Sequence, residues 1–287
     1  MKNLLKSDLF RARKDKVLWI GLFVCIGLVI FQVLLSKILV LTMASDAEES
    51  ISGLLAVSGM ALWSNGVSIN GNTAQLLVPI FVTIFIVKEF SDRTIRNKLI
   101  IGYSRSQIYF SIIIVHIIVS FVYVFAASLI GLIFGSILFG FGTTVSGEAI
   151  AMLIVGFLLQ FILSYIVLGF AIVFAINKQS LILGIILPIA IAFVFSIIYL
   201  VAAMGLSDGF SKVVSFSNFY QTTELQNMTS VSDLFVKSVI TIKDGEETVK
   251  SIYLPLTPFA RIMLTAPIII VLEIIIGYFR FKKIQFK

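Results

Sequence analysis

The sequence predicts an all-α polytopic membrane protein with six transmembrane helices. Of its 287 residues, 59% are hydrophobic and only 13% are charged, which is about half the charged fraction of an average soluble protein. The mean hydropathy is +1.08. The apolar residues are gathered in runs long enough to cross about 30 Å of hydrocarbon as helices. Six such spans are expected, at about 17–41, 73–88, 107–139, 149–176, 180–204 and 261–281.

The cations are concentrated on one side of these spans. Six lie in residues 1–16, five in residues 88–107, one is Lys178, and four lie in the C-terminal tail. Short cytoplasmic segments of membrane proteins are enriched in Lys and Arg. The distribution therefore predicts that both termini are cytoplasmic, in a multi-pass protein of a plasma membrane, and we expect a bacterial source.

The segments outside the spans have distinct characters. Residues 1–16 carry an apolar stripe among cations, as expected for an amphipathic helix in the membrane interface, although a plain positive-inside anchor would share these charges. The segment before the last span predicts a small extracellular cap with a β-hairpin that turns at Asp244-Gly245. The expected organisation is an interfacial helix at 1–16, five spans at 17–204, the cap at 205–260, and the last span with a cytoplasmic tail at 261–287.

The most informative polar segment is the insert between the second and third spans, residues 88–107. It holds five cations and two acids, yet it keeps apolar residues at helical spacing. The pattern predicts a short amphipathic helix, at about 91–103, on the cytoplasmic face. Such a helix is a candidate docking surface for a soluble partner. The spaced apolar residues are Phe90, Ile95, Leu99 and Tyr103.

Glu89 stands where the second span meets the insert, among cations. An ion pair with Arg93, four residues further along a helix, or with Arg96 is expected. Such a pair would lock the corner between span and insert. The alternative is that Glu89 is one more solvated surface charge.

Glu273 and His116 are the ionisable residues inside predicted spans that are candidates for a functional site. Glu273 interrupts the last span, where a charged carboxylate costs about 2.5–3.5 kcal/mol, so we expect it to face protein or water. It is either a proton or substrate site or a packing carboxyl that is hydrogen-bonded to a neighbouring helix. His116 in the third span is either a hydrogen-bonded packing residue or a proton relay.

The residue pattern argues against catalysis by this chain. The single cysteine, Cys25, allows no intrachain disulfide. No set of His, Cys, Asp and Glu residues has the spacing of metal ligands, and no glycine-rich phosphate loop occurs. We therefore expect no catalytic residues, no metal and no bound cofactor. We also expect no nucleic-acid partner, because the cytoplasmic segments account for the net charge of +7.

The insert resembles that of the permease subunits of type-II ABC exporters, the ABC-2-type permease family. A span ends in Glu, Arg-Thr-Ile-Arg and a basic helix follow, and Gly-Tyr-Ser-Arg precedes the next span. Where the family often has Gly-Thr and Pro-x-Ser-Arg, this chain has Arg93 and Gly102. The expected topology of the whole chain is also similar. The matching residues are Glu89, Arg93, Thr94, Ile95, Arg96, Lys98, Leu99, Gly102, Ser104 and Arg105.

The resemblance implies a mechanism. Two permease copies would pair, as a homodimer or with a different permease, above two cytoplasmic ABC ATPase subunits that hold ATP and Mg. The insert would be the coupling helix, with all the matching residues except Gly102 serving the ATPase contact. ATP binding would shift the spans between inward and outward states, with the first, second and fifth spans lining the pathway. The apolar spans favour export of a hydrophobic or amphipathic cargo, such as a small peptide, toxin or antibiotic.

Two other functions stay open at this point. A proton-coupled secondary carrier would use Glu273 and His116, although no internal repeat typical of such carriers is visible. A non-transporting immunity or sensor membrane subunit could bind an ATPase and move nothing. In every case the lipid bilayer is a partner of the chain.

Overall fold

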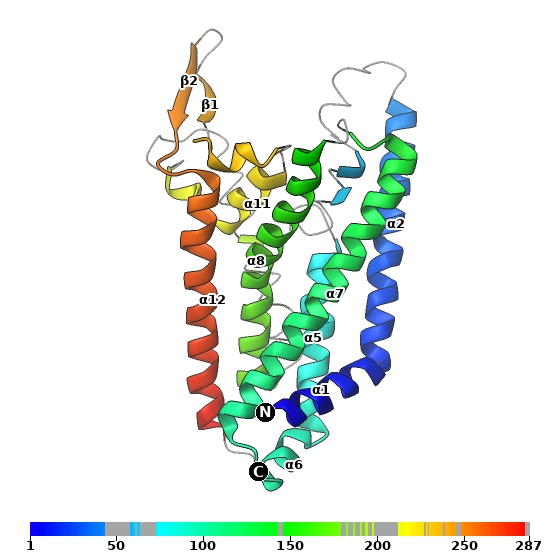
Figure 1. Ribbon diagram of the computed structural model, residues 1–287, viewed down its shortest axis with the longest axis vertical. Coiled ribbons are helices and arrows are strands. Elements are labelled where there is room, and N and C mark those ends of the chain that lie inside the picture. The colour runs from blue at the N-terminus through cyan, green and yellow to red at the C-terminus, as the bar shows by residue number, and fades with distance from the viewer. Residues whose placement is uncertain are drawn as a thin grey trace.

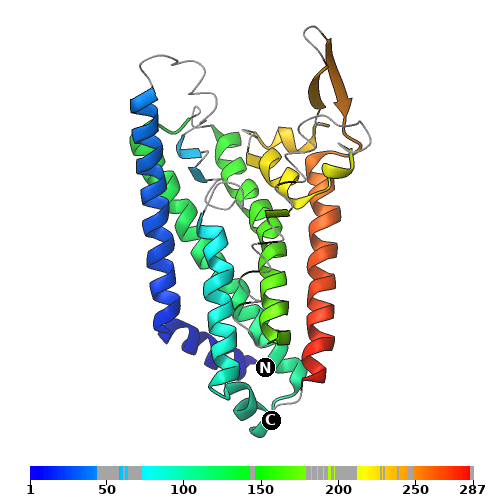
Figure 2. The same cartoon turned by 180° about the vertical axis from the view of Figure 1, so that it is seen from behind.

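The computed structural model is mainly helical and forms one elongated bundle (Figures 1 and 2). It describes residues 1–43, 58–60, 62–63, 73–142, 146–178, 212–226, 228, 230–237, 239–244 and 248–284, with single positions between 182 and 197. The elements are α1 (Lys2–Lys14), α2 (Lys16–Met43), α5 (Thr73–Ser91), α6 (Thr94–Ile100), α7 (Arg105–Phe139), α8 (Gly147–Lys178), α11 (Asn218–Gln226), the 3₁₀ helix η1 (Ser232–Phe235), β1 (Val239–Asp244), β2 (Thr248–Tyr253) and α12 (Pro258–Lys283).

The two ends of the bundle differ in structure (Figure 1). One end, called the terminal end here, holds α1, α6 and the C-terminal part of α12. The other, called the loop end, holds α11, η1 and the two strands. Helix α1 lies across the base of the bundle, and the chain then turns sharply into α2.

Four helices of the described residues are long and apolar enough to cross a membrane. They correspond to the expected first, third, fourth and sixth spans. Helix α5 forms where the second span is expected and packs against α2, α7 and α8, but it is not among these four. The expected fifth span, 180–204, lies outside the described residues apart from single positions. The four candidate spans are Lys16–Ile38, Arg105–Phe139, Gly147–Val173 and Pro258–Lys283.

Capping side chains set the ends of these helices. Asp15 has an extended backbone between α1 and α2, and its Oδ1 accepts a hydrogen bond from the Val17 amide at 2.8 Å. Thr257 caps α12, with Pro258 as the first helical residue. Each cap satisfies an amide that the helix itself leaves without a partner. Asp15 therefore ends α1, begins α2 and produces the sharp turn between them.

The outer faces of the long helices are apolar. Large side chains such as Phe23 and Phe31 of α2, Ile137 of α7, and Ile268 and Phe279 of α12 are more than half exposed. Soluble proteins rarely expose continuous apolar surfaces of this kind. Together with the four candidate spans, these faces show that the chain is a multi-pass membrane protein.

The loop end is held to the bundle by buried polar contacts. Arg261, at the start of α12, is fully buried, and its Nη2 lies 2.7 Å from both carboxylate oxygens of Glu224 in α11. Its Nη1 donates to the Ser215 carbonyl at 3.2 Å. In α8, the Gln160 side chain donates to the Thr222 carbonyl of α11 at 3.0 Å. These bonds fix α11 between α8 and α12.

Strands β1 and β2 pair in antiparallel fashion within the segment where the sequence predicts a hairpin. Asp244 pairs with Thr248. Asp244 therefore belongs to a strand and not to the expected Asp244-Gly245 turn. The residues between the strands, 245–247, lie outside the described part of the chain.

Candidate functional site

The insert folds as a helical corner at the tip of the terminal end (Figure 1). Helix α5 runs on to Ser91, a two-residue turn follows, and α6 spans seven residues. Arg93 in the turn has φ 54°, a left-handed conformation that costs a residue with a Cβ about 1–2 kcal/mol. Gly102 ends the corner with φ 101°, which glycine adopts without that cost. The predicted helix at about 91–103 is therefore a shorter helix with a sharp turn before it.

One face of α6 is packed into the bundle. Ile95 is 1% exposed, and Phe90, Leu99 and Tyr103 pack against the same hydrophobic core as Ile95. These are the apolar residues at helical spacing in the insert. Their burial holds α6 against the ends of α5 and α7.

A buried ion network fixes the same face of α6. The Lys98 Nζ lies 2.8 Å from Asp8 Oδ1 of α1 and 3.4 Å from Glu89 Oε2 of α5. Arg11 of α1 places Nη1 3.2 Å from Glu89 Oε1 and donates from Nη2 to Thr94 Oγ1 at 3.3 Å. We call Asp8, Arg11, Glu89 and Lys98 the corner network.

The corner network balances two carboxylates with two cations. Asp8, Glu89 and Lys98 are each less than 7% exposed, and a buried charge is tolerated when it is paired and hydrogen-bonded. Asp8 also accepts a hydrogen bond from Ser111 of α7 at 2.7 Å. Burial raises the pKa of Glu89, whereas Lys98 and Arg11 act to lower it. The network therefore connects α1, α5 and α6 through charges that depend on one another, and Ser111 bonds α7 to it.

The opposite face of α6 is open. Arg93, Arg96 and Asn97 are exposed, and Ile100 and Ile101 are 73% and 74% exposed. Arg93 and Arg96 make no ion pair with any residue that the structure describes. Two isoleucines beside two arginines thus form a basic and apolar surface at the end of the molecule.

The end of the insert is tied to the last helix. Ser104 and Gln107 form a capping box at the start of α7, in which each side chain binds the backbone amide of the other. Arg105 Nη1 donates to the carbonyls of Lys282 and Ile284 at 2.6 and 2.7 Å. Ser104 therefore sets where α7 begins, and Arg105 joins α7 to the C-terminal end of α12.

The expected partners of Glu89 are wrong. The predicted pairs with Arg93 or Arg96 assume one continuous helix, but the left-handed turn at Arg93 interrupts it. Glu89 is buried and binds Lys98 and Arg11 instead. Sequence analysis did not single out Asp8 or Arg11. The available signal was an acid, Asp8, in an otherwise basic N-terminal helix.

Glu273 and His116 are buried in different places. Both carboxylate oxygens of Glu273 lack a hydrogen-bond partner among the described residues, as does His116 Nε2. Glu273 lies beside Tyr109, Tyr165 and Gly169, and a Cβ on Gly169 would lie 1.9 Å from Glu273 Oε2. His116 instead forms a T-shaped ring contact with Phe85, with 5.6 Å between the ring centroids. No ion pair or hydrogen bond links Glu273 with His116.

Within the described residues, no three His, Cys, Asp or Glu side chains are grouped so that they could hold a metal ion. The polar features at the terminal end are therefore a paired charge network and an open surface. Such an arrangement can transmit a displacement between helices and can bind a protein. Four of the residues that supply it, Glu89, Arg93, Arg96 and Lys98, are among those on which the resemblance to ABC-2-type permeases rests.

Comparison with known proteins identifies the family. No match to the chain was found among curated proteins or among solved structures. Residues 4–199 match the family described as ABC-2 family transporter protein. The match includes most of α1, the corner network and α6, and it confirms the resemblance seen in the insert. The chain therefore belongs to the ABC-2 family of transporter proteins, as a transmembrane subunit of the permease type.

Proposed function

We propose that this protein is the permease subunit of an ATP-driven ABC exporter, with the terminal end in the cytoplasm. A separate ABC ATPase binds ATP and Mg and docks on the exposed face of α6. Two permease copies and two ATPase subunits form the working transporter. The cargo leaves the cell by alternating access of the spans.

The division of α6 into two faces is the observation that carries this proposal. The inner face is fixed by Ile95 and Lys98, whereas the outer face exposes Arg93, Arg96, Ile100 and Ile101. The buried core of a protein interface is more apolar than the rest of the surface, and interfaces are enriched in arginine and depleted in lysine. A surface of two isoleucines and two arginines therefore suits a protein partner better than it suits water.

The corner network supplies the mechanical connection. A displacement of α6 would be transmitted to Glu89 and Asp8 through the Lys98 ion pairs. It would be transmitted to Arg11 through the hydrogen bond with Thr94. These contacts lie on α5 and α1, and Asp8 is bonded in turn to α7. Closure of the ATPase pair on ATP would thus move three helices together with α6. Charged pairs with short distances resist sliding better than apolar contacts do, because they are directional.

The spans favour a hydrophobic or amphipathic cargo, such as a small peptide, toxin or antibiotic. Between Val17 and Met43, α2 has Lys37 as its single charged residue, and the Lys37 Nζ donates to the Leu138 carbonyl at 3.1 Å. This cation is already engaged by the protein. A pathway along such a helix offers apolar contact and few charges for a polar sugar to bind.

Co-purification from the native membrane tests the proposal. The wild-type chain should retain a soluble ATPase, and Arg93→Glu with Arg96→Glu should lose it, because both charges on the docking face are reversed. Lys2→Glu with Lys6→Glu is the matched control, since these exposed cations lie on α1 at the same end. Retention of no ATPase by the wild type would contradict the proposal. Equal loss in both double variants would show a general charge effect and not docking on α6.

A second candidate function rests on Glu273. A buried carboxyl without a hydrogen-bond partner among the described residues is also what a proton-coupled carrier would place in its pathway. That function predicts transport driven by a pH gradient in vesicles without ATP, and abolished by Glu273→Gln. ATP-dependent transport that survives Glu273→Gln would exclude it.

A further inference from the structure

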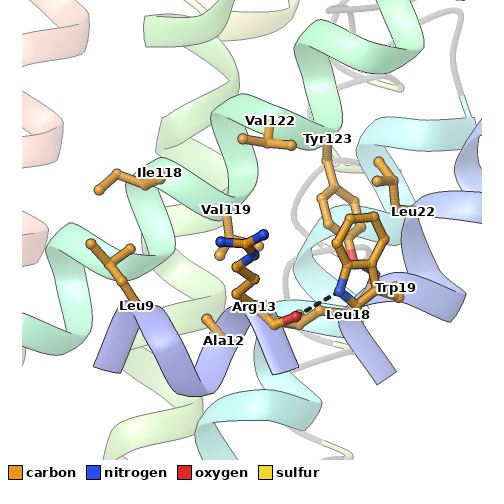
Figure 3. A pocket seen from close by; sticks show the side chains of 10 residues that line it. All are labelled: Leu9, Ala12, Arg13, Leu18, Trp19, Leu22, Ile118, Val119, Val122 and Tyr123. Atoms are coloured by element: carbon orange, nitrogen blue, oxygen red, sulfur yellow. Dashed lines mark hydrogen bonds between the residues drawn. The ribbon is translucent and has the colours of Figure 1, made fainter. Parts of the chain in front are cut away.

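An apolar groove of about 210 Å³ lies outside the corner network, in the angle between α1, α2 and α7 (Figure 3). It is lined by Leu9 and Ala12 of α1, by Leu18 and Leu22 of α2, and by Val122 of α7. Side chains of the three helices converge on the groove in the close-up view.

Arg13 is the one charged side chain lining the groove among the described residues. Its guanidinium extends from α1 toward Val119 of α7 (Figure 3). No hydrogen bond or ion pair engages the guanidinium within the described part of the chain, whereas Arg11, two residues earlier, lies in the corner network. A guanidinium over an apolar surface gains most from an anion, and phosphate matches its two-donor geometry.

Trp19 places the groove at the level of the lipid headgroups. Its indole Nε1 donates to the Arg13 carbonyl at 2.7 Å, and the side chain is 47% exposed. Tryptophan is enriched where membrane helices meet the water interface. Trp19 lies in the first turn of the candidate span Lys16–Ile38, so we expect the apolar groove to extend from the headgroup region toward the hydrocarbon.

We propose that this groove binds one anionic glycerophospholipid, with an acyl chain along the apolar lining and the headgroup phosphate on Arg13. The exposed ammonium of Lys16, at the start of α2, adds a second cation at the same turn. A lipid with a net negative headgroup complements both cations. A zwitterionic headgroup carries a cation of its own next to the phosphate, so its net attraction to the two cations of the protein is weaker. This site involves neither α6 nor the ATPase, so it stands apart from the proposed function.

The size of the groove fits a part of a long ligand. Sites that bury a whole drug-sized molecule have volumes of about 300–1,000 Å³, and this groove has about 210 Å³. A single chain of a lipid can fill the groove while its remainder stays in the bilayer. A compact amphipathic cargo would have to leave much of its apolar surface outside.

Quenching of Trp19 by brominated acyl chains tests the site directly. The chain has two tryptophans, so Trp63→Phe leaves Trp19 as the reporter in the full-length protein. Nanodiscs would contain unlabelled phosphatidylcholine with increasing fractions of brominated phosphatidylglycerol or of brominated phosphatidylcholine. Phosphatidylglycerol should quench at an about fivefold lower fraction, the factor that one cation contributes at an anionic membrane surface.

Two variants separate a specific site from diffuse charge. Arg13→Gln should remove most of the preference for phosphatidylglycerol and leave only the weaker attraction of Lys16. Lys14→Gln makes the same charge change at the next residue, which lies against the Phe10 ring and does not line the groove, and it should keep the preference. Val122→Phe, which narrows the groove, should weaken quenching by both lipids.

Three results would overturn the proposal. The first is equal quenching by the two brominated lipids in the Trp63→Phe protein. The second is an equal loss of preference in Arg13→Gln and Lys14→Gln, which would assign it to the general charge of α1. The third is relief of quenching by inorganic phosphate at the concentration of the lipid, which would assign Arg13 to a free anion.

Discussion

Two buried ion-pair clusters hold opposite ends of this molecule, and they differ in how they share charge. At the loop end, one cation, Arg261, binds one carboxylate, Glu224, through a single nitrogen that is 2.7 Å from both oxygens. At the terminal end, Lys98 divides its charge between Asp8 and Glu89, and Arg11 also reaches both. The loop-end ion pair joins two helices, whereas the ion pairs of the corner network join three, with α7 bonded to Asp8 through Ser111.

The difference indicates two roles for buried charge in one fold. Arg261 is fully buried and also stacks over the Tyr220 ring, 5.5 Å from its centroid, so the pair fixes α11 in one position. The corner network has an alternative partner for each charge, and Arg11 is 32% exposed at its side chain. A network of this kind can change its pairing while every charge stays partnered. We expect rigidity from the first cluster and transmission from the second.

The largest effect is expected from Glu224→Ala at the loop end. It leaves the fully buried guanidinium of Arg261 without its carboxylate, and loss of one partner from a buried pair costs about 3–5 kcal/mol. Thermal unfolding in detergent, followed by the loss of monodisperse protein, measures the change. Arg261→Met should cost less, because it leaves Glu224, whose side chain is 10% exposed, closer to water. Equal melting temperatures for the two variants would contradict this asymmetry.

The next effect is expected from Lys98→Met in the corner network. Asp8 and Glu89 would then share Arg11 alone, and we expect a loss of about 3 kcal/mol, at the low end for a broken buried pair. Arg96→Met is the matched control on the same helix, because Arg96 is exposed and makes no ion pair in the described structure. It should melt as the wild type does. A Lys98→Met protein with unchanged melting would show that the corner network does not stabilise the terminal end.

The smallest effect is expected from Glu273→Gln. Glu273 makes no ion pair and no hydrogen bond with any described residue, so an amide of the same shape should change stability by less than about 1 kcal/mol. Glu89→Gln, the same chemical change within the corner network, should cost about 2 kcal/mol, because hydrogen bonds to charged groups contribute about 1.5–3 kcal/mol. Parallel melting curves of the two variants measure the difference. A larger loss for Glu273→Gln would mean that its charge has a partner in the folded protein.

Local patterns in the sequence predicted the helical class and the inner face of α6. Phe90, Ile95, Leu99 and Tyr103 could be assigned to one face because apolar periodicity depends only on neighbours along the chain. The long apolar runs likewise predicted four helices that the structure shows as candidate spans. Such features need no knowledge of which helices meet in space.

The partners of Glu89 could not be predicted in this way. Arg11 is 78 positions earlier in the chain, and Lys98 faces Glu89 only because the chain reverses at Arg93. A left-handed conformation at an arginine has no sequence signal, since glycine is the residue that favours it. The ion pair of Arg261 could not be predicted either, because its partner is also distant in the sequence. Arg261 was assigned to the start of the last span, and Glu224 lies in the segment expected to be an outer cap.

Site-specific crosslinking from the exposed face of α6 tests the central claim most directly. In a Cys25→Ser background, which contains no other cysteine, Ile100→Cys would carry a photoactivatable crosslinker in native membranes. Phe235→Cys, 59% exposed at the loop end, would be the control. We predict that Ile100→Cys captures an ATP-hydrolysing subunit and that Phe235→Cys does not. Capture of no ATPase from Ile100, with the protein folded and in the membrane, would contradict docking on α6.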